Sequence, residues 1–230
     1  MARRKFSNLL ALAVLSCLAE RPMHPYEISQ TLRQRGKDQS IKLNYGALYG
    51  VVESLAKAGF IEARETVREG RRPERTVYAI TDAGVEEHEE WLAELIGTPV
   101  RDYHSLEAGL ALVAGLAPDH VVRLLEDRVV KLRVELASVD EGLRIAEEMR
   151  LPEVFYVEAE FRRTMLRAEL EYVGDLATRI RKGTLGGLEG WRRLHELIAE
   201  GMSLEEIFQD PIRHLGKDGE PFAPSAEGPG

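Results

Sequence analysis

The spacing of apolar and polar residues predicts α-helices along most of the chain. Residues 8–20 are apolar almost all round, which is typical of a helix at the centre of a core. Three more helices and two β-prone runs are expected before residue 97, over residues 25–35, 45–58, 60–67, 76–80 and 82–96. The order helix, helix, helix, hairpin, helix predicts a winged helix-turn-helix.

Residues at the expected helix ends support these bounds. His24 precedes Pro25, which suits the first turn of a helix, and Glu27 adds a favourable negative charge there. Asn44 is a good N-cap for the third helix, and Gly59 is suited to end it in a left-handed conformation.

The chain beyond residue 99 is predicted to be helical, with long helices from residue 118 and over residues 153–182. In the first of these, apolar residues follow alternating spacings of three and four, at Val122, Leu125, Val129, Leu132, Leu136, Val139, Leu143 and Ala146. A stripe of more than three heptads with charged neighbours is typical of a coiled-coil seam. We therefore expect these side chains to join two copies of the chain into a homodimer.

The predicted fold class is mainly α with one β-hairpin. The winged helix-turn-helix is expected over residues 1–96, and an all-helical dimerisation and effector domain over residues 97–214. Residues 215–230 are expected to be a disordered tail, because glycine, proline, alanine and charged residues predominate there.

Charge is distributed unevenly between these regions. The whole chain has a net charge of -8, yet residues 1–80 carry 14 Lys and Arg against 8 Asp and Glu, a net charge of +6. The remaining residues have a net charge of -14. A basic module joined to an acidic one favours nucleic-acid binding by the first, although a solvated acidic helix face would produce the same asymmetry.

The single cysteine and the N-terminus bear on the cellular compartment. Cys17 excludes an intramolecular disulfide and a cysteine-built zinc site, and its apolar surroundings predict burial. Basic residues 3–5 before an apolar run resemble a signal peptide. However, the run leads to Glu20 without a small-residue cleavage site and is too short to span a bilayer. We therefore expect a cytoplasmic protein that does not contact a membrane.

The third helix and the hairpin turn carry residue types that bind DNA. A helix with small and polar residues at its exposed N-terminal end can enter the major groove, while a basic turn contacts phosphates beside it. The expected contacts with double-stranded DNA are Tyr26, Asn44, Tyr45, Gly46, Ala47, Tyr49, Arg68, Arg71, Arg72 and Arg75. A two-fold dimer would bring both helices to an inverted-repeat operator.

Five segments within residues 8–96 together resemble the PadR family of bacterial transcriptional regulators. They are LAVL at 12–15, HPYEI at 24–28, NYGALY at 44–49, LAKAGFIE at 55–62 and RPERTVYAITDAG at 72–84. The resemblance implies that the third helix reads DNA and that the C-terminal helices build a dimer. It also implies that a small aromatic or drug-like molecule releases a repressor from DNA. Many relatives have Ser-Pro-Gly-Thr-Leu-Tyr where this chain has NYGALY, so we expect a different operator preference.

Three aromatic residues have two interpretations each. Tyr26 and Tyr49 either contact the DNA backbone or pack against the protein. Trp91, on the fourth helix, either packs in a core or forms a wall of an aromatic ligand pocket, which compact relatives build there.

An enzyme and a protein-protein adaptor are the competing functions. The six histidines form no metal-binding pair, and the sequence has no phosphate loop, dinucleotide fingerprint or nucleophile elbow. We therefore expect no catalytic residues, no metal and no cofactor. A helical adaptor that keeps a winged helix without binding DNA would share the heptad stripe, but would have no reason to keep the arginine-rich turn.

Overall fold

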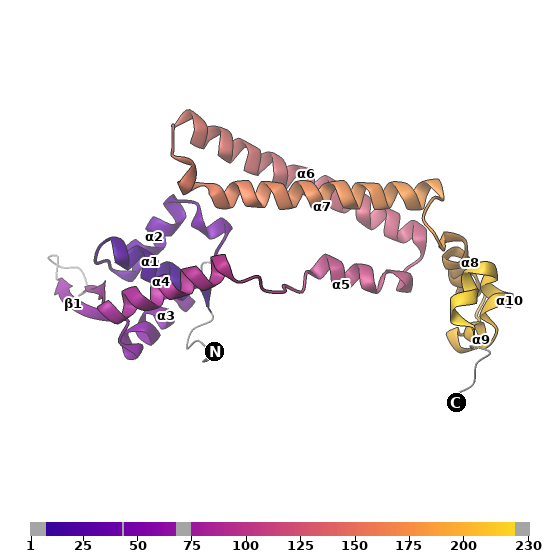
Figure 1. The fold of residues 1–230 in the computed structure, drawn as a ribbon, viewed down its shortest axis with the longest axis horizontal. Coiled ribbons are helices and arrows are strands. Elements are labelled where there is room, and N and C mark those ends of the chain that lie inside the picture. Colours follow the sequence, from indigo (N-terminus) through magenta and orange to yellow (C-terminus); the bar gives the residue numbers. More distant parts are fainter. Residues whose placement is uncertain (1–7, 43, 68–74, 224–230) are drawn as a thin grey trace. The chain divides into compact units, whose positions relative to one another are not determined.

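The structure, a computed structural model, describes residues 8–42, 44–67 and 75–223 (Figure 1). The chain divides into two compact units, Met1–Asp102 and Tyr103–Gly230. Both are mainly helical, and the sheet found in the described residues is one antiparallel hairpin in the first unit. The predicted fold class, a winged helix-turn-helix followed by helices, is confirmed.

The first unit has the predicted order of elements around a central helix. They are α1 (Leu9–Glu20), α2 (Pro25–Gln34), α3 (Tyr45–Ala58), β1 (Ile61–Val67), β2 (Arg75–Ile80) and α4 (Asp82–Gly97), with a 3-10 turn at Lys37–Gln39. Most residues of α1 are buried, and α2, α3, α4 and β2 all pack against it. An apolar helix with no exposed stripe is stable only when neighbours cover it on every side, as here.

Backbone hydrogen bonds join the base of the hairpin to the helices. Met23 and Tyr78 exchange two bonds, each 3.0 Å from nitrogen to oxygen. The Thr81 N–H donates to the carbonyl oxygen of Phe60 at 3.0 Å, and its hydroxyl donates to that of Gly59 at 2.7 Å. The hairpin is therefore held against the C-terminal end of α3.

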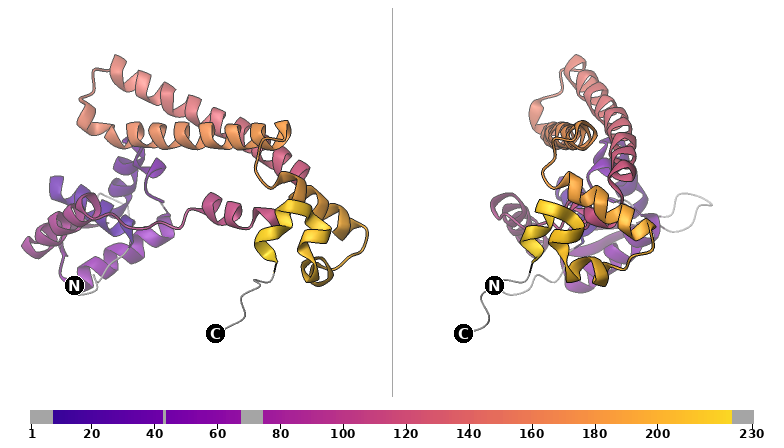
Figure 2. Two further views of the ribbon diagram at one scale, coloured as in Figure 1. Left: turned by 45° about the vertical axis from the view of Figure 1, so that its right-hand side comes forward. Right: turned by 90° about the vertical axis from the view of Figure 1, so that its right-hand side faces the viewer.

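The second unit is a helical hairpin followed by a cluster of short helices. Its helices are α5 (Ser105–Ala111), α6 (Pro118–Glu148), α7 (Val157–Lys182), α8 (Leu188–Ala199), α9 (Leu204–Gln209) and α10 (Pro211–Leu215). Three 3-10 turns lie at Val113–Gly115, Glu153–Phe155 and Gly216–Phe222. Helices α6 and α7 run antiparallel side by side, and α8, α9 and α10 gather beyond them (Figures 1 and 2).

The apolar stripe of α6 packs against α7 of the same chain. Leu132, Val139 and Leu143 are buried in one cluster with Leu166 of α7. Leu125 is buried in a second cluster that includes four residues of α7, and Val122, Val129 and Leu136 pack beside these clusters. The seam is closed within one chain, which corrects the expectation that its side chains hold a second copy. The dimer itself stays a prediction.

Residues 216–222 form 3-10 turns, whereas the composition predicts a disordered tail from residue 215. The carboxylate of Asp218 accepts a hydrogen bond from the Gly190 N–H at 2.8 Å. Gly219 lies so close to Pro211 that an added Cβ would be 2.0 Å from its carbonyl oxygen. The expectation of disorder is therefore wrong up to Ala223, because these glycines permit backbone packing that composition does not reveal. Residues 224–230 lie outside the described part of the chain.

Candidate nucleic-acid interface

Helix α3 has one buried and one exposed face. Leu48, Val52 and Leu55 are fully buried in the core of the first unit. The exposed face carries Gly46, Ala47, Tyr49, Gly50 and Glu53. The apolar spacing thus fixes which residues of α3 can contact a partner, and those near its N-terminus are small.

The two glycines on the exposed face of α3 are not required by the fold. A Cβ added at Gly46 would meet only the Asn44 Oδ1, at 3.5 Å, and one added at Gly50 would meet nothing within 4 Å. Glycine inside a helix costs about 1 kcal/mol relative to alanine. Their spacing of four residues places them one turn apart on a surface that a ligand backbone can approach closely.

The N-terminus of α3 is capped as predicted. The Asn44 Oδ1 accepts a hydrogen bond from the Gly46 N–H at 3.0 Å, so the amide NH₂ group of Asn44 takes no part in this cap. Tyr45 is the first residue of α3, but its side chain lies outside the described structure. The positive end of the helix dipole and its remaining N–H groups favour negative ligands such as phosphate.

Tyr26 and Tyr49 are half exposed, each with 47% of its surface accessible. Tyr26 lies in the first turn of α2, where its hydroxyl accepts a hydrogen bond from the Gln30 Nε2 at 2.6 Å. The start of α2 is closed by a capping box between His24 and Glu27. Exposure favours the DNA-backbone interpretation of both tyrosines over core packing, although their contacts stay predictions.

The arginine-rich turn of the hairpin is described only at its margins. Arg68, Arg71 and Arg72 lie outside the described residues. Arg75 is the first residue of β2 and pairs with Val67 across the antiparallel ladder. The ladder has an irregularity between Ala63 and Glu65.

Other basic residues near α3 differ in their availability. Lys42 is exposed and precedes the N-cap Asn44 by two residues, so it is a candidate phosphate contact that the sequence analysis missed. The sequence feature that could have identified Lys42 is a lysine close to the N-terminus of a predicted helix. Arg35, in contrast, is engaged within the fold, because its guanidinium donates to the Glu20 carboxylate at 2.7 Å. This hydrogen bond lowers the pKa of Glu20 below its ordinary value.

Trp91 packs in the core of the first unit and is only 4% exposed. Leu92 lies beside the same cluster. Within the chain, its side chain is therefore a core residue, which favours the packing interpretation, and a role in a ligand pocket stays a prediction.

Two other titratable groups serve the fold of the first unit. Burial raises the pKa of the Cys17 thiol to about 11, so the reactive thiolate is disfavoured at neutral pH. The Ser16 Oγ and His88 Nε2 lie 2.8 Å apart and link α1 to α4, and burial lowers the pKa of His88. Neither group lies on the exposed face of α3.

The described residues contain no metal-binding cluster of three or more His, Cys, Asp or Glu side chains. No helix in the same part of the chain is long and apolar enough to cross a membrane.

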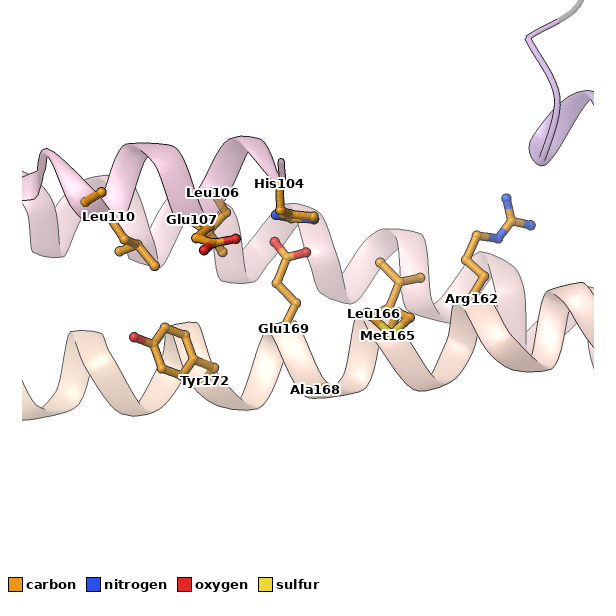
Figure 3. Close-up of a pocket in the computed structure, with 11 residues that line it drawn as sticks. His104, Leu106, Glu107, Leu110, Arg162, Met165, Leu166, Ala168, Glu169 and Tyr172 are labelled. Carbon is orange, nitrogen blue, oxygen red and sulfur yellow. The ribbon is translucent and has the colours of Figure 1, made fainter. Parts of the chain in front are cut away.

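A pocket that the sequence analysis did not predict lies in the second unit. It has a volume of about 650 Å³ and lies between α5 and the middle of α7. Figure 3 shows its lining residues, which come from two segments about sixty residues apart in the sequence. No local motif could have indicated it.

Comparison with known proteins relates the first unit to one family of regulators. Residues 14–90 match the family described as "Transcriptional regulator PadR-like family". The curated protein "Negative transcriptional regulator PadR" of Bacillus subtilis is 26% identical over 135 residues, which cover 57% of this chain and 71% of the relative. Both matches are with transcriptional regulators.

Solved structures share the fold of both regions. Bacillus subtilis PadR in complex with operator DNA has a TM-score of 0.60 and 18% identity, with 75% of this chain and 99% of that chain covered. PadR from the same organism in complex with p-coumaric acid has a TM-score of 0.61 and 16% identity, covering 76% and 99%. A PadR-like regulator from Bacillus cereus has a TM-score of 0.54 and 15% identity, with the same coverage.

Proposed function

We propose that this chain, whose residues 14–90 match the PadR-like family of transcriptional regulators, represses transcription by binding operator DNA as a dimer until a small molecule releases it. DNA binding is proposed because residues 14–90 match a family of transcriptional regulators and a structure of the Bacillus subtilis relative contains operator DNA. Repression is proposed because the Bacillus subtilis relative is a negative regulator. Release by a ligand is proposed because a structure of that relative contains p-coumaric acid.

The observation that carries the proposal is the exposed face of α3. Gly46 and Gly50 leave a smooth surface that the fold does not require, and Leu48 and Val52 hold the opposite face in the core. We propose that the N-terminal end of α3 enters the major groove. Asn44, Tyr45, Gly46 and Ala47 would then lie beside base edges, while Tyr26, Tyr49, Lys42 and the arginines of the turn would contact phosphates.

The dimer would place two copies of α3 on successive major grooves. An inverted repeat with half-sites about 34 Å apart, or a multiple of this distance, is the operator that such a dimer fits. Selection from random DNA tests this directly. Recovery of a motif without two-fold symmetry would contradict the docking proposal.

Gly46→Val separates DNA binding from folding. The new Cβ would make only an ordinary contact with the Asn44 Oδ1, at 3.5 Å, so the fold should persist, whereas the side chain would block close approach to DNA. We expect specific affinity to fall to the level of non-specific DNA, a loss of about a thousandfold or more. The matched control is Gly142→Val on α6, where an added Cβ meets nothing within 4 Å.

Tyr45→Ala tests base reading by the same helix end. If Tyr45 makes a good base contact, the variant should change the preferred half-site by about 1–3 kcal/mol in selections run beside the unmodified protein. Identical recovered motifs would show that Tyr45 reads no base. Equal operator affinity for Gly46→Val and Gly142→Val would refute the placement of α3 in the groove.

A further inference from the structure

The pocket between α5 and α7 has a mainly apolar lining. Leu106 and Leu110 line it from α5, and Met165 and Leu166 line it from α7, on the side of Glu169 away from Tyr172 (Figure 3). Its volume of about 650 Å³ lies within the range of roughly 300–1,000 Å³ that is typical of small-molecule sites. Met165 is half exposed, so apolar surface is available to a ligand there.

Two carboxylates point into the pocket, and the His104 side chain lies beside one of them, that of Glu169 (Figure 3). Glu107 comes from α5 and Glu169 from α7, and both side chains are directed into the gap between the helices (Figure 3). The Glu169 side chain is only 18% exposed, and its Oε1 accepts a hydrogen bond from the Arg128 Nε at 2.6 Å. Arg128 therefore holds Glu169 in place and offsets its charge.

Glu107 supplies the negative charge that is not offset in this way. It is exposed, and no ion pair of Glu107 is found in the described part of the chain. The Arg162 guanidinium lies at one end of the pocket and points away from the two carboxylates (Figure 3). A carboxylate ligand seated beside Glu107 would be repelled by its charge, whereas a cation would be attracted.

The opposite end of the pocket carries an aromatic ring. Tyr172 lines this end and is half exposed, across from Leu110 (Figure 3). The face of an aromatic ring attracts a cation, most strongly one with a large apolar and weakly hydrated surface. Apolar walls, a carboxylate and an exposed tyrosine ring are together complementary to such a ligand.

We propose that the pocket between α5 and α7 binds a hydrophobic organic cation, with Glu107 opposite the positive charge and Tyr172 against the apolar body. That this cation is the effector rests on the ligand-released repressor proposed above. Binding itself does not depend on it. The ligand thus differs in charge from the p-coumaric acid seen with the Bacillus subtilis relative.

Two probes of the same shape and opposite charge test the proposal. Tetraphenylphosphonium and tetraphenylborate are titrated separately into the full-length protein and followed by calorimetry. We expect the cation to bind at least about tenfold more tightly than the anion, because a close charge pair contributes about one power of ten in affinity at a partly exposed site. Equal affinities would overturn the proposal.

Variants locate the site. Glu107→Gln should weaken tetraphenylphosphonium binding roughly tenfold, and Tyr172→Leu should weaken it severalfold while keeping an apolar wall. The matched control is Glu171→Gln, which removes the same charge from an exposed position on α7 that does not line the pocket. Circular dichroism checks that each variant is folded. Equal binding by the Glu107 and Glu171 variants would place the cation elsewhere and refute the proposal.

The same titrations separate this inference from the proposed function. Operator binding is measured in the absence of ligand. A protein that does not bind the operator would refute the proposed repressor function but would leave the assignment of the pocket intact. Cation binding that leaves the operator complex unchanged would overturn the effector role. If neither probe binds and Tyr172→Leu instead dissociates a dimer in sedimentation, a second copy occupies the pocket and the ligand site is refuted.

Discussion

Gly84→Ala should destabilise the first unit although alanine is the better helix former. Gly84 lies in the first turn of α4, where an added Cβ would be 2.0 Å from the carbonyl oxygen of Phe60 and 2.8 Å from the Ile80 Cγ1. Such distances do not occur in folded proteins, and the nearest atom belongs to the backbone. The N-terminus of α4 or the Phe60 peptide must therefore move.

The size of the effect follows from two opposing contributions. Alanine in place of glycine stabilises a helix by about 1 kcal/mol. Overpacking typically costs about 1–3 kcal/mol and occasionally more. Movement here would also strain the Thr81 hydrogen bonds to Phe60 and Gly59, which are each worth about 1 kcal/mol. We expect a net loss of about 2 kcal/mol, which lowers the melting temperature of a unit of this size by about 8–16 °C.

Trp91 reports on this unit selectively. The chain has two tryptophans, so Trp191→Phe leaves Trp91, in the core of the first unit, as the only one. Urea unfolding followed by its fluorescence gives the free energy of unfolding. Gly97→Ala is the control, because its added Cβ meets nothing within 4 Å on the same helix. Equal stability of the two variants would show that the contact between α4 and Phe60 is not as close as the structure has it.

Three further predictions concern DNA, pH and assembly. Alanine at Arg71, Arg72 or Arg75 should weaken binding to all DNA sequences alike and flatten the plot of log K against log salt by about 0.9 for each lost phosphate contact. An unchanged slope would argue against a phosphate role. Because burial lowers the pKa of His88, the folded state favours neutral imidazole, so stability is lost as the pH falls below the ordinary value of 6.5. The melting temperature of the unmodified protein should therefore fall more between about pH 7.5 and about pH 5.5 than that of the His88→Gln variant. Parallel curves of melting temperature against pH for the two proteins would contradict this. Val130→Asp with Val134→Asp should give monomers with unchanged helicity, because both side chains are exposed, at 60% and 69%; a stable dimer in sedimentation would exclude this face of α6.

The first unit could be predicted closely because its signals are local. The third helix was expected over residues 45–58 and is found there, since Asn44 caps its first turn and Gly59 ends it at a φ of 81°. The strands β1 (Ile61–Val67) and β2 (Arg75–Ile80) also lie close to the two runs that were expected. The contact between Gly84 and Phe60 was not predicted, because a glycine required by tertiary packing looks the same in sequence as one that is merely permitted.

The second unit was predicted less closely because its details depend on distant contacts. A helix was expected from residue 153, but Glu153–Phe155 forms a 3-10 turn and α7 begins at Val157. Tyr156 between them has a φ of -137°, which is not helical. The pocket residues Glu107 and Tyr172 could not have been paired from sequence, since nothing in either segment indicates that α5 lies against α7.

A heptad repeat predicts which face of a helix is buried more securely than it predicts which helix covers that face. Residues 118–148 and 157–182 each carry an apolar stripe, and the break at Leu151-Pro152 separates them. Two such stripes joined by a short turn meet within one chain without the translational and rotational entropy loss of association. Packing of the two helices within one chain was therefore the simpler arrangement, and it could have been predicted from the sequence. A dimer must then use apolar side chains outside the seam, and Val130 and Val134 point away from it, one turn apart on α6. If their substitution by aspartate leaves the dimer intact, the contact must be sought on another helix, because the seam residue Leu132 is already covered by α7.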